Sequence, residues 1–67
     1  MNVFDNVAFP LRERGERDPE VIGRKVDESL AMVNMRGHEK KMPVNLSGGM
    51  RKRVALARAI KIGRAHV

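Results

Sequence analysis

Hydrophobic positions recur at helical spacing in three stretches of this chain, separated by polar segments. The first stretch, residues 3–9, carries apolar side chains that fit two turns of helix: Val3, Phe4, Val7 and Ala8. Pro10 follows it, and the residue before a proline avoids the helical region of backbone space. The pattern therefore predicts a short helix that ends before Pro10, and an exposed, charged loop over residues 11–18.

The second stretch, residues 19–35, has the clearest periodicity. Its apolar positions fall on one helical face: Ile22, Val26, Leu30 and Val33. Asp18 is a suitable N-cap, Pro19 suits the first helical position, and Glu20 complements the positive helix end. The pattern predicts an amphipathic helix over residues 19–35, with Gly37 as its stop signal.

The third stretch follows a polar, basic connector at residues 38–45. Ser47 stands where an N-cap belongs, and Met50, Val54 and Ala57 then share one helical face. The sequence thus predicts an all-α fold of about three helices. Of the two aromatic residues, Phe9 is expected to pack within it, whereas for Phe4 packing is one of two interpretations.

Composition limits what so small a chain is able to do. It has 67 residues and no cysteine, and its two histidines, His38 and His66, lie far apart without companion ligands, so neither a disulfide framework nor a metal site is expected. No apolar run has the length needed to span a bilayer, and no signal peptide is visible. The expected location is the cytoplasm, without direct insertion into the membrane.

The charge is divided unevenly along the chain. Residues 1–35 hold five basic and seven acidic side chains, whereas residues 36–67 hold nine basic and one acidic. The net charges of the two halves are therefore −2 and +8. This asymmetry indicates contact of the second half with phosphate, nucleic acid or an anionic surface, although a solvated basic face explains it equally well.

The Ser-Gly-Gly sequence at residues 47–49 is an unusual way to begin a helix. A helix N-terminus presents unpaired N–H groups and the positive end of the macrodipole, and glycine lets an anion approach the main chain closely. Each glycine costs roughly 1 kcal/mol of helix stability relative to alanine, so a close ligand or a second backbone would explain its presence. An ordinary cap followed by a flexible turn is the simpler alternative for this triplet alone.

The longer string LSGGMRKRVALARA resembles the signature motif of ATP-binding cassette (ABC) ATPases. That motif is usually written LSGGQ and is followed by a basic pair, a hydrophobic pair and ARA. The matching positions are Leu46, Ser47, Gly48, Gly49, Arg53, Val54, Ala55, Ala57, Arg58 and Ala59. Met50 replaces the usual glutamine and, with Met42 and Pro43 upstream, is similar to the Mla and Mce-type branch that serves phospholipid transport. The opening NVFDNVAFPLRE also looks like that branch, in the segment after the Q-loop.

The resemblance covers residues 1 to about 60 and implies a helical subdomain of a P-loop α/β ATPase. It implies that two ATPase subunits pair head to tail, with Mg²⁺-bound ATP between the P-loop of one and the signature motif of the other. Ser47 would then bond the γ-phosphate, and the amides of Gly48 and Gly49 would complete its binding site, in the signature motif Leu46–Met50. Val3, Phe4 and Glu39 match regions that contact the membrane-spanning permease subunit. The implied location is the inner face of the cell membrane, through that permease.

Several family motifs are absent from the sequence. There is no GxxxxGK[ST] phosphate loop, Q-loop glutamine, magnesium-binding acidic strand or switch histidine. Residues 1–60 are therefore interpreted as a fragment of the subdomain, inactive as an ATPase by itself and containing no catalytic residue. Residues 61–67, KIGRAHV, depart from the family pattern and are expected to be a non-native tail.

Two alternatives address the basic second half. A nucleic-acid-binding module would use residues 50–64 to neutralise phosphates, but no aromatic residues interleave to stack on bases. A cationic membrane-surface helix would have a weakly inserting face, because that face is rich in alanine. Both alternatives explain the charge and neither explains the glycines, so the ABC resemblance is preferred.

Overall fold

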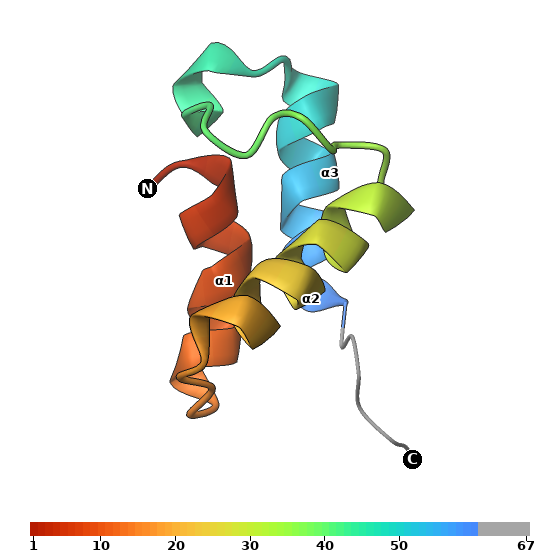
Figure 1. Cartoon of the computed structure of the whole chain (residues 1–67). Helices are drawn as coiled ribbons and strands as arrows, with labels where there is room; N and C mark the ends of the chain where they lie inside the picture. Colours follow the sequence, from red (N-terminus) through yellow and green to blue (C-terminus); the bar gives the residue numbers. More distant parts are fainter. Residues whose placement is uncertain (61–67) are drawn as a thin grey trace.

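The structure is a computed structural model that describes residues 1–60. It contains three α helices, α1 (Val3–Glu13), α2 (Pro19–Met32) and α3 (Gly48–Ala59), and a short 3-10 helix, η1 (Pro43–Asn45) (Figure 1). No strand occurs within residues 1–60, so the predicted all-α fold with three helices is confirmed. The proposed non-native tail at residues 61–67 lies outside the described residues and stays a prediction.

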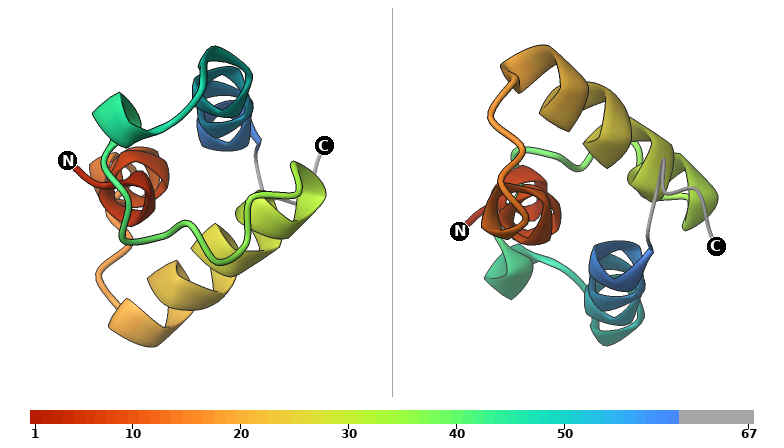
Figure 2. Two further views of the ribbon diagram at one scale, coloured as in Figure 1. Left: turned by 90° about the horizontal axis from the view of Figure 1, so that it is seen from above. Right: turned by 90° about the horizontal axis from the view of Figure 1, so that it is seen from below.

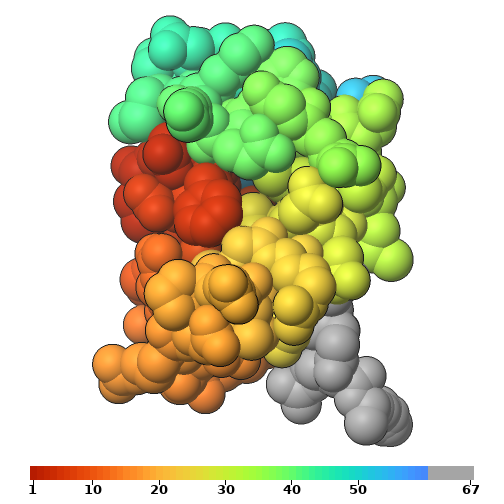
Figure 3. All heavy atoms as spheres, in the orientation of Figure 1, coloured from red at the N-terminus to blue at the C-terminus, as the bar shows by residue number. Residues whose placement is uncertain are grey.

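The helices form one small bundle. Helices α1 and α3 lie side by side and run in the same direction, and α2 crosses them obliquely (Figure 2). The N-terminal ends of α1 and α3 are consequently at the same end of the molecule. The connector at residues 38–45 packs over this end, directly against the start of α1 (Figure 3).

The core is aliphatic and takes residues from every segment. Helix α2 buries the predicted face, with Ile22, Val26, Leu30 and the capping residue Val33 all less than 10% exposed. The remaining core side chains come from α1, α3 and the loop between α2 and α3: Val3, Val7, Ala8, Met35, Leu46, Val54 and Ala57. These contacts confirm the helical faces inferred from the spacing of apolar residues in α2 and α3.

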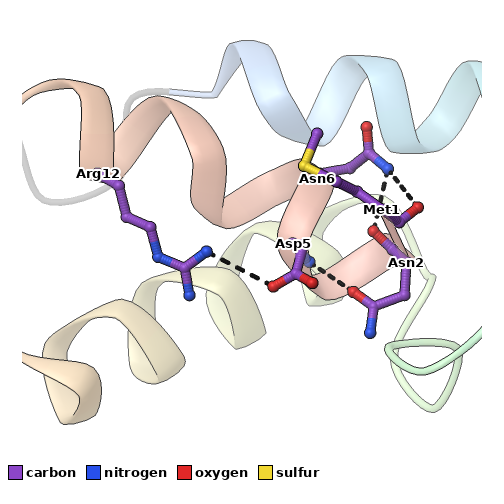
Figure 4. A network of polar contacts seen from close by, with 5 residues as sticks. All are labelled: Met1, Asn2, Asp5, Asn6 and Arg12. Atoms are coloured by element: carbon purple, nitrogen blue, oxygen red, sulfur yellow. Dashed lines mark hydrogen bonds and ion pairs between the residues drawn. The ribbon is translucent and has the colours of Figure 1, made fainter.

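Helix α1 begins with a well-formed cap. The Asn2 Oδ1 accepts a hydrogen bond from the Asp5 amide at 2.7 Å, and the Asn6 side chain donates to the carbonyls of Met1 and Asn2 (Figure 4). Asp5 also pairs with Arg12 across 3.5 Å, two turns further along the helix. The cap stabilises the first turn of α1, and the exposed ion pair adds little.

The predicted end of the first helix before Pro10 is wrong. Helix α1 continues through Pro10 to Glu13, so the loop predicted over residues 11–18 begins three residues later, at residue 14. Proline in a helix interior removes one hydrogen bond and costs about 3 kcal/mol. Packing offsets that cost, because Val7 and Ala8 are buried before the proline and Leu11 packs against the core after it.

The predicted stop of the second helix is also wrong. Helix α2 ends at Met32, and Asn34, not Gly37, supplies the left-handed residue that terminates it, with φ of 59°. The Met35 amide donates to the Leu30 carbonyl at 2.8 Å and the Asn34 amide to the Ala31 carbonyl at 3.2 Å. These are the two hydrogen bonds of a Schellman motif, and burial of Met35 against the core favours this earlier ending.

The two phenylalanines differ in their environments. Phe4 packs against the core, whereas Phe9 is 41% exposed. Phe9 follows Val7 by two positions, which rotates its side chain about 200° around the helix axis and away from the core face. The expectation that Phe9 packs in the core is therefore wrong.

Candidate anion-binding site

The Ser47–Gly49 turn begins α3 as the sequence predicted. Ser47 is the N-cap, with an extended backbone, and its Oγ accepts a hydrogen bond from the Met50 amide at 3.2 Å. Leu46, the residue before it, is buried in the core and fixes where the turn lies. Ser47, Gly48 and Gly49 are all exposed, so this helix end faces solvent.

Neither glycine in the turn is required by its own backbone or by packing. Gly48 and Gly49 are not among the residues with positive φ, and a Cβ built on either would meet no atom within 4 Å. Alanine would therefore fit at both positions within residues 1–60, and it would favour the helix. Within residues 1–60, the space in front of both glycines is therefore open.

The amides of the same two residues are also free. Among residues 1–60, no acceptor is hydrogen-bonded to the Gly48 or Gly49 amide, whereas the Met50 amide is bonded to Ser47 and the Arg51 amide to the Ser47 carbonyl. Two adjacent unpaired N–H groups at a helix start, with no side chain in front of them, form a favourable place for an anion.

The charge on α3 strengthens this preference. The helix carries four basic side chains and no acidic one: Arg51, Lys52, Arg53 and Arg58. The three ion pairs found within residues 1–60 involve other segments, so no α3 side chain is neutralised by one there. Cations near a helix N-terminus oppose the macrodipole, and a bound anion relieves that repulsion.

One further side chain at the turn was not identified from the sequence. The Arg51 guanidinium folds back over the first turn of α3, and its Nη1 donates a hydrogen bond to the Leu46 carbonyl at 2.8 Å. A basic run gives no signal of which member makes such a contact, because the acceptor is a main-chain atom.

The structure brings together the three residues predicted to contact a permease. The Phe4 amide donates to the Glu39 carbonyl at 2.9 Å, and the Val3 amide donates to the Lys41 carbonyl at 2.8 Å. The Val3 side chain is fully buried, so only Phe4 and Glu39, both half-buried, present surface to a partner. Contact of Val3, Phe4 and Glu39 with a permease stays a prediction.

The carboxyl of Glu39 has a lowered pKa. Hydrogen bonds from its own backbone amide and from the Gly37 amide, together with the positive charge of Arg36, hold the pKa of its carboxyl below the ordinary value. The carboxylate thus stays charged and closes the turn in which the connector begins.

The Ser47–Gly49 turn is a surface feature. Hollows in residues 1–60 lie elsewhere: one is lined by Arg12, Glu16, Arg17 and Ile22, and another by Pro10, Ala55, Arg58 and Ala59. No group of three or more His, Cys, Asp or Glu side chains within residues 1–60 is arranged to hold a metal ion. None of the helices in this part of the chain is both long and apolar enough to cross a bilayer. The described residues therefore place the Ser47–Gly49 turn on the surface, outside these hollows.

Comparison with known proteins gives close relatives. No protein-family model matches the chain. It is 53% identical over 60 residues to "Probable ribonucleotide transport ATP-binding protein mkl" of Mycobacterium tuberculosis, and 52% identical over 62 residues to "Intermembrane phospholipid transport system ATP-binding protein MlaF" of Escherichia coli. The two alignments cover 90% and 92% of this chain. The chain belongs to the ATP-binding proteins of ABC transporters.

Membership in this family agrees with the string LSGGM at residues 46–50, which resembles the family's signature motif. The corresponding protein of Mycobacterium leprae is 52% identical over 60 residues, again covering 90% of this chain. The chain spans 17% of the length of the mycobacterial relatives and 23% of the Escherichia coli relative. The roles of Leu46, Ser47, Gly48, Gly49 and Met50 in nucleotide binding stay predictions.

Proposed function

We propose that residues 1–60 act as the helical part of an ABC-transporter ATPase that binds, through the Ser47–Gly49 turn, the γ-phosphate of an ATP held by an opposing subunit. The Ser47 hydroxyl and the free Gly48 and Gly49 amides would donate hydrogen bonds to the phosphate oxygens. This proposal rests on the Gly48 and Gly49 amides, which have no hydrogen-bond partner within residues 1–60 and no side chain in front of them. Preorganised N–H donors of this kind stabilise developing charge in phosphoryl transfer.

The one-sided exposure of the turn supports a site shared between two subunits. The chain contains no phosphate loop, so Mg²⁺-ATP would be held mainly by other sequence, with this turn closing over its terminal phosphate. We infer a homodimer of ATPase subunits, each supplying one turn, joined to a membrane-spanning permease near Phe4 and Glu39. Loss of the γ-phosphate on hydrolysis would remove the bond across the interface and release the pair.

Phospholipid is the proposed transport substrate. The support is the identity to the Escherichia coli protein whose name gives intermembrane phospholipid transport, and the methionine at position 50. The mycobacterial relatives carry ribonucleotide transport in their names, so nucleotides are the competing substrate class. The proposed location is the inner face of the cell membrane, through the permease. The nucleic-acid-binding alternative is not favoured, because the reported relatives are all named as ATP-binding proteins.

The proposal is tested in a full-length chimaera, in which residues 1–60 replace the aligned segment of the Mycobacterium tuberculosis relative. Gly49→Leu keeps the backbone N–H, but its side chain should hold the phosphate away from the amides; we expect ATP turnover to fall by about 100-fold or more, as when an oxyanion loses a donor. Gly23→Leu is the matched control, because a Cβ at Gly23 also meets nothing within 4 Å and Gly23 lies in α2. Equal turnover in the parent and the Gly49→Leu chimaera would show that the turn does not hold the phosphate.

A further inference from the structure

We propose that Arg51 is a positioning residue, which orients the Ser47–Gly49 turn through its hydrogen bond to the Leu46 carbonyl. The inference rests on the proposed function of the turn and adds a residue to it. Arg51 is exposed and belongs to a run of three cations, which is typical of a solvated charge. Its contact at 2.8 Å with a main-chain oxygen sets it apart from its neighbours.

The Leu46 carbonyl lies outside the α3 hydrogen-bond ladder. Helix α3 begins after Ser47, whose carbonyl is the first acceptor of the ladder and receives the Arg51 amide at 2.9 Å. The carbonyl of Leu46 precedes that acceptor, so the helix itself supplies no donor to it. The Arg51 side chain supplies the donor from one turn along.

The hydrogen bond from Arg51 to the Leu46 carbonyl constrains the whole peptide unit between Leu46 and Ser47. The Leu46 carbonyl and the Ser47 amide belong to one planar peptide unit and point in opposite directions. When the Arg51 guanidinium holds the carbonyl, it also sets the plane from which the Ser47 side chain projects. The buried Leu46 side chain anchors the same peptide from the core. The position of the Ser47 Oγ is thus set by one apolar and one polar contact.

The same hydrogen bond also keeps the positive charge of Arg51 beside the Ser47–Gly49 turn. Its backbone amide and guanidinium are both bonded to the turn, to the carbonyls of Ser47 and Leu46 respectively. The guanidinium is therefore held near the turn, whereas Arg53 makes no side-chain hydrogen bond within residues 1–60 and is exposed. This difference separates an effect of geometry from a general effect of positive charge.

The test uses the same chimaera and compares three variants. Arg51→Met keeps most of the aliphatic stem and removes the donor; it should lower kcat about 10-fold, since displacement of a group by ~1 Å can cost up to about 100-fold. The KM for ATP should change less than about twofold, because the turn acts on charge that develops during the reaction. Arg51→Lys should also lose at least about fivefold in kcat, because one ammonium does not reproduce the planar guanidinium contact. Arg53→Met removes one α3 charge and no hydrogen bond found within residues 1–60, so it should lower kcat by less than about threefold, clearly less than Arg51→Met.

The outcomes are separable. Parent-like kcat in either Arg51→Met or Arg51→Lys overturns the inference, as does an equal loss in Arg53→Met. If Gly49→Leu is inactive while both Arg51 variants are normal, the proposed function stands and only the positioning role fails. If Gly49→Leu is fully active, the proposed function itself fails.

A second measurement applies if an Arg51 variant of the chimaera does not fold. In the chain itself, the nuclear magnetic resonance signals of the Leu46 carbonyl and the Ser47 amide should shift in Arg51→Met and stay unchanged in Arg53→Met. Unchanged signals in both variants would overturn the positioning role.

Discussion

Helices α1 and α3 begin at the same end of the molecule, but the N–H groups of their first turns have different partners. In α1, the amides of Val3 and Phe4 bond the connector carbonyls and the amide of Asp5 bonds the Asn2 side chain. In α3, only the third amide, that of Met50, has a partner among residues 1–60. The first three amides of α1 are therefore hydrogen-bonded within the chain, whereas two of the first three amides of α3 have no partner among residues 1–60.

This difference shows what the glycines contribute. The first residues of α1 carry side chains that pack in or against the core, and an acid at Asp5 complements the helix end. The first residues of α3 have no side chain, and no acid lies on that helix. Within residues 1–60, the Gly48 and Gly49 amides are therefore available to a partner, as the proposed function requires.

The largest difference is expected in amide hydrogen exchange. Val3 and Phe4 should exchange at least about tenfold more slowly than Gly48 and Gly49, because only the first pair is hydrogen-bonded to the connector. Nuclear magnetic resonance of the chain without nucleotide measures this directly, with rates corrected for the intrinsic exchange of each residue type. Equal protection of the two pairs would mean that the α3 start is closed in solution.

The two side-chain caps should differ by a smaller amount. Asn2→Ala is expected to lower the free energy of unfolding by about 1 kcal/mol, and Ser47→Ala by less than half of that. The Asn2 bond is 2.7 Å and partly buried, whereas the Ser47 bond is 3.2 Å and exposed. Denaturant unfolding followed by circular dichroism compares the two. Asn2→Asp restores an acceptor at the first site and serves as its control; a larger cost at Ser47 would contradict the comparison.

The smallest effect is expected at Glu39, whose backbone carbonyl helps close the start of α1. Because the folded pKa of its carboxyl lies below the ordinary value, the carboxylate contributes stability that is fully present above the unfolded pKa, about 4.3. That contribution is lost as the pH falls through the lower folded pKa. Glu39→Gln should therefore be less stable than the parent near pH 7 and equal to it at the acidic end of an unfolding series. A difference that persists unchanged at low pH would contradict this assignment.

Local signals predicted much of the fold. The period of apolar residues gave the buried face of α2, and Asp18 and Ser47 were identified as caps before the structure confirmed them. Such signals are readable because a helical face and an N-cap each depend on residues only a few positions apart.

The errors arose where distant contacts outweighed local preference. Pro10 is tolerated in α1 because the residues on both sides of it reach the core, and α2 ends at Met32 because the turn at Asn34 brings Met35 into the core. The main-chain partners at the site were hidden for another reason. The carbonyls of Glu39, Lys41 and Leu46 act as acceptors whatever their side chains are, so no residue type indicated them.

Burial of Leu46 links the candidate site to the temperature range in which the chain stays folded. Leu46 is 5% exposed and directly precedes Ser47, so the same apolar contacts that hold the helices together also set the position of the turn. The turn therefore has no stability independent of the helix packing. Warming that loosens the packing should disorder the turn in the same step, because a small domain has little stability to spare.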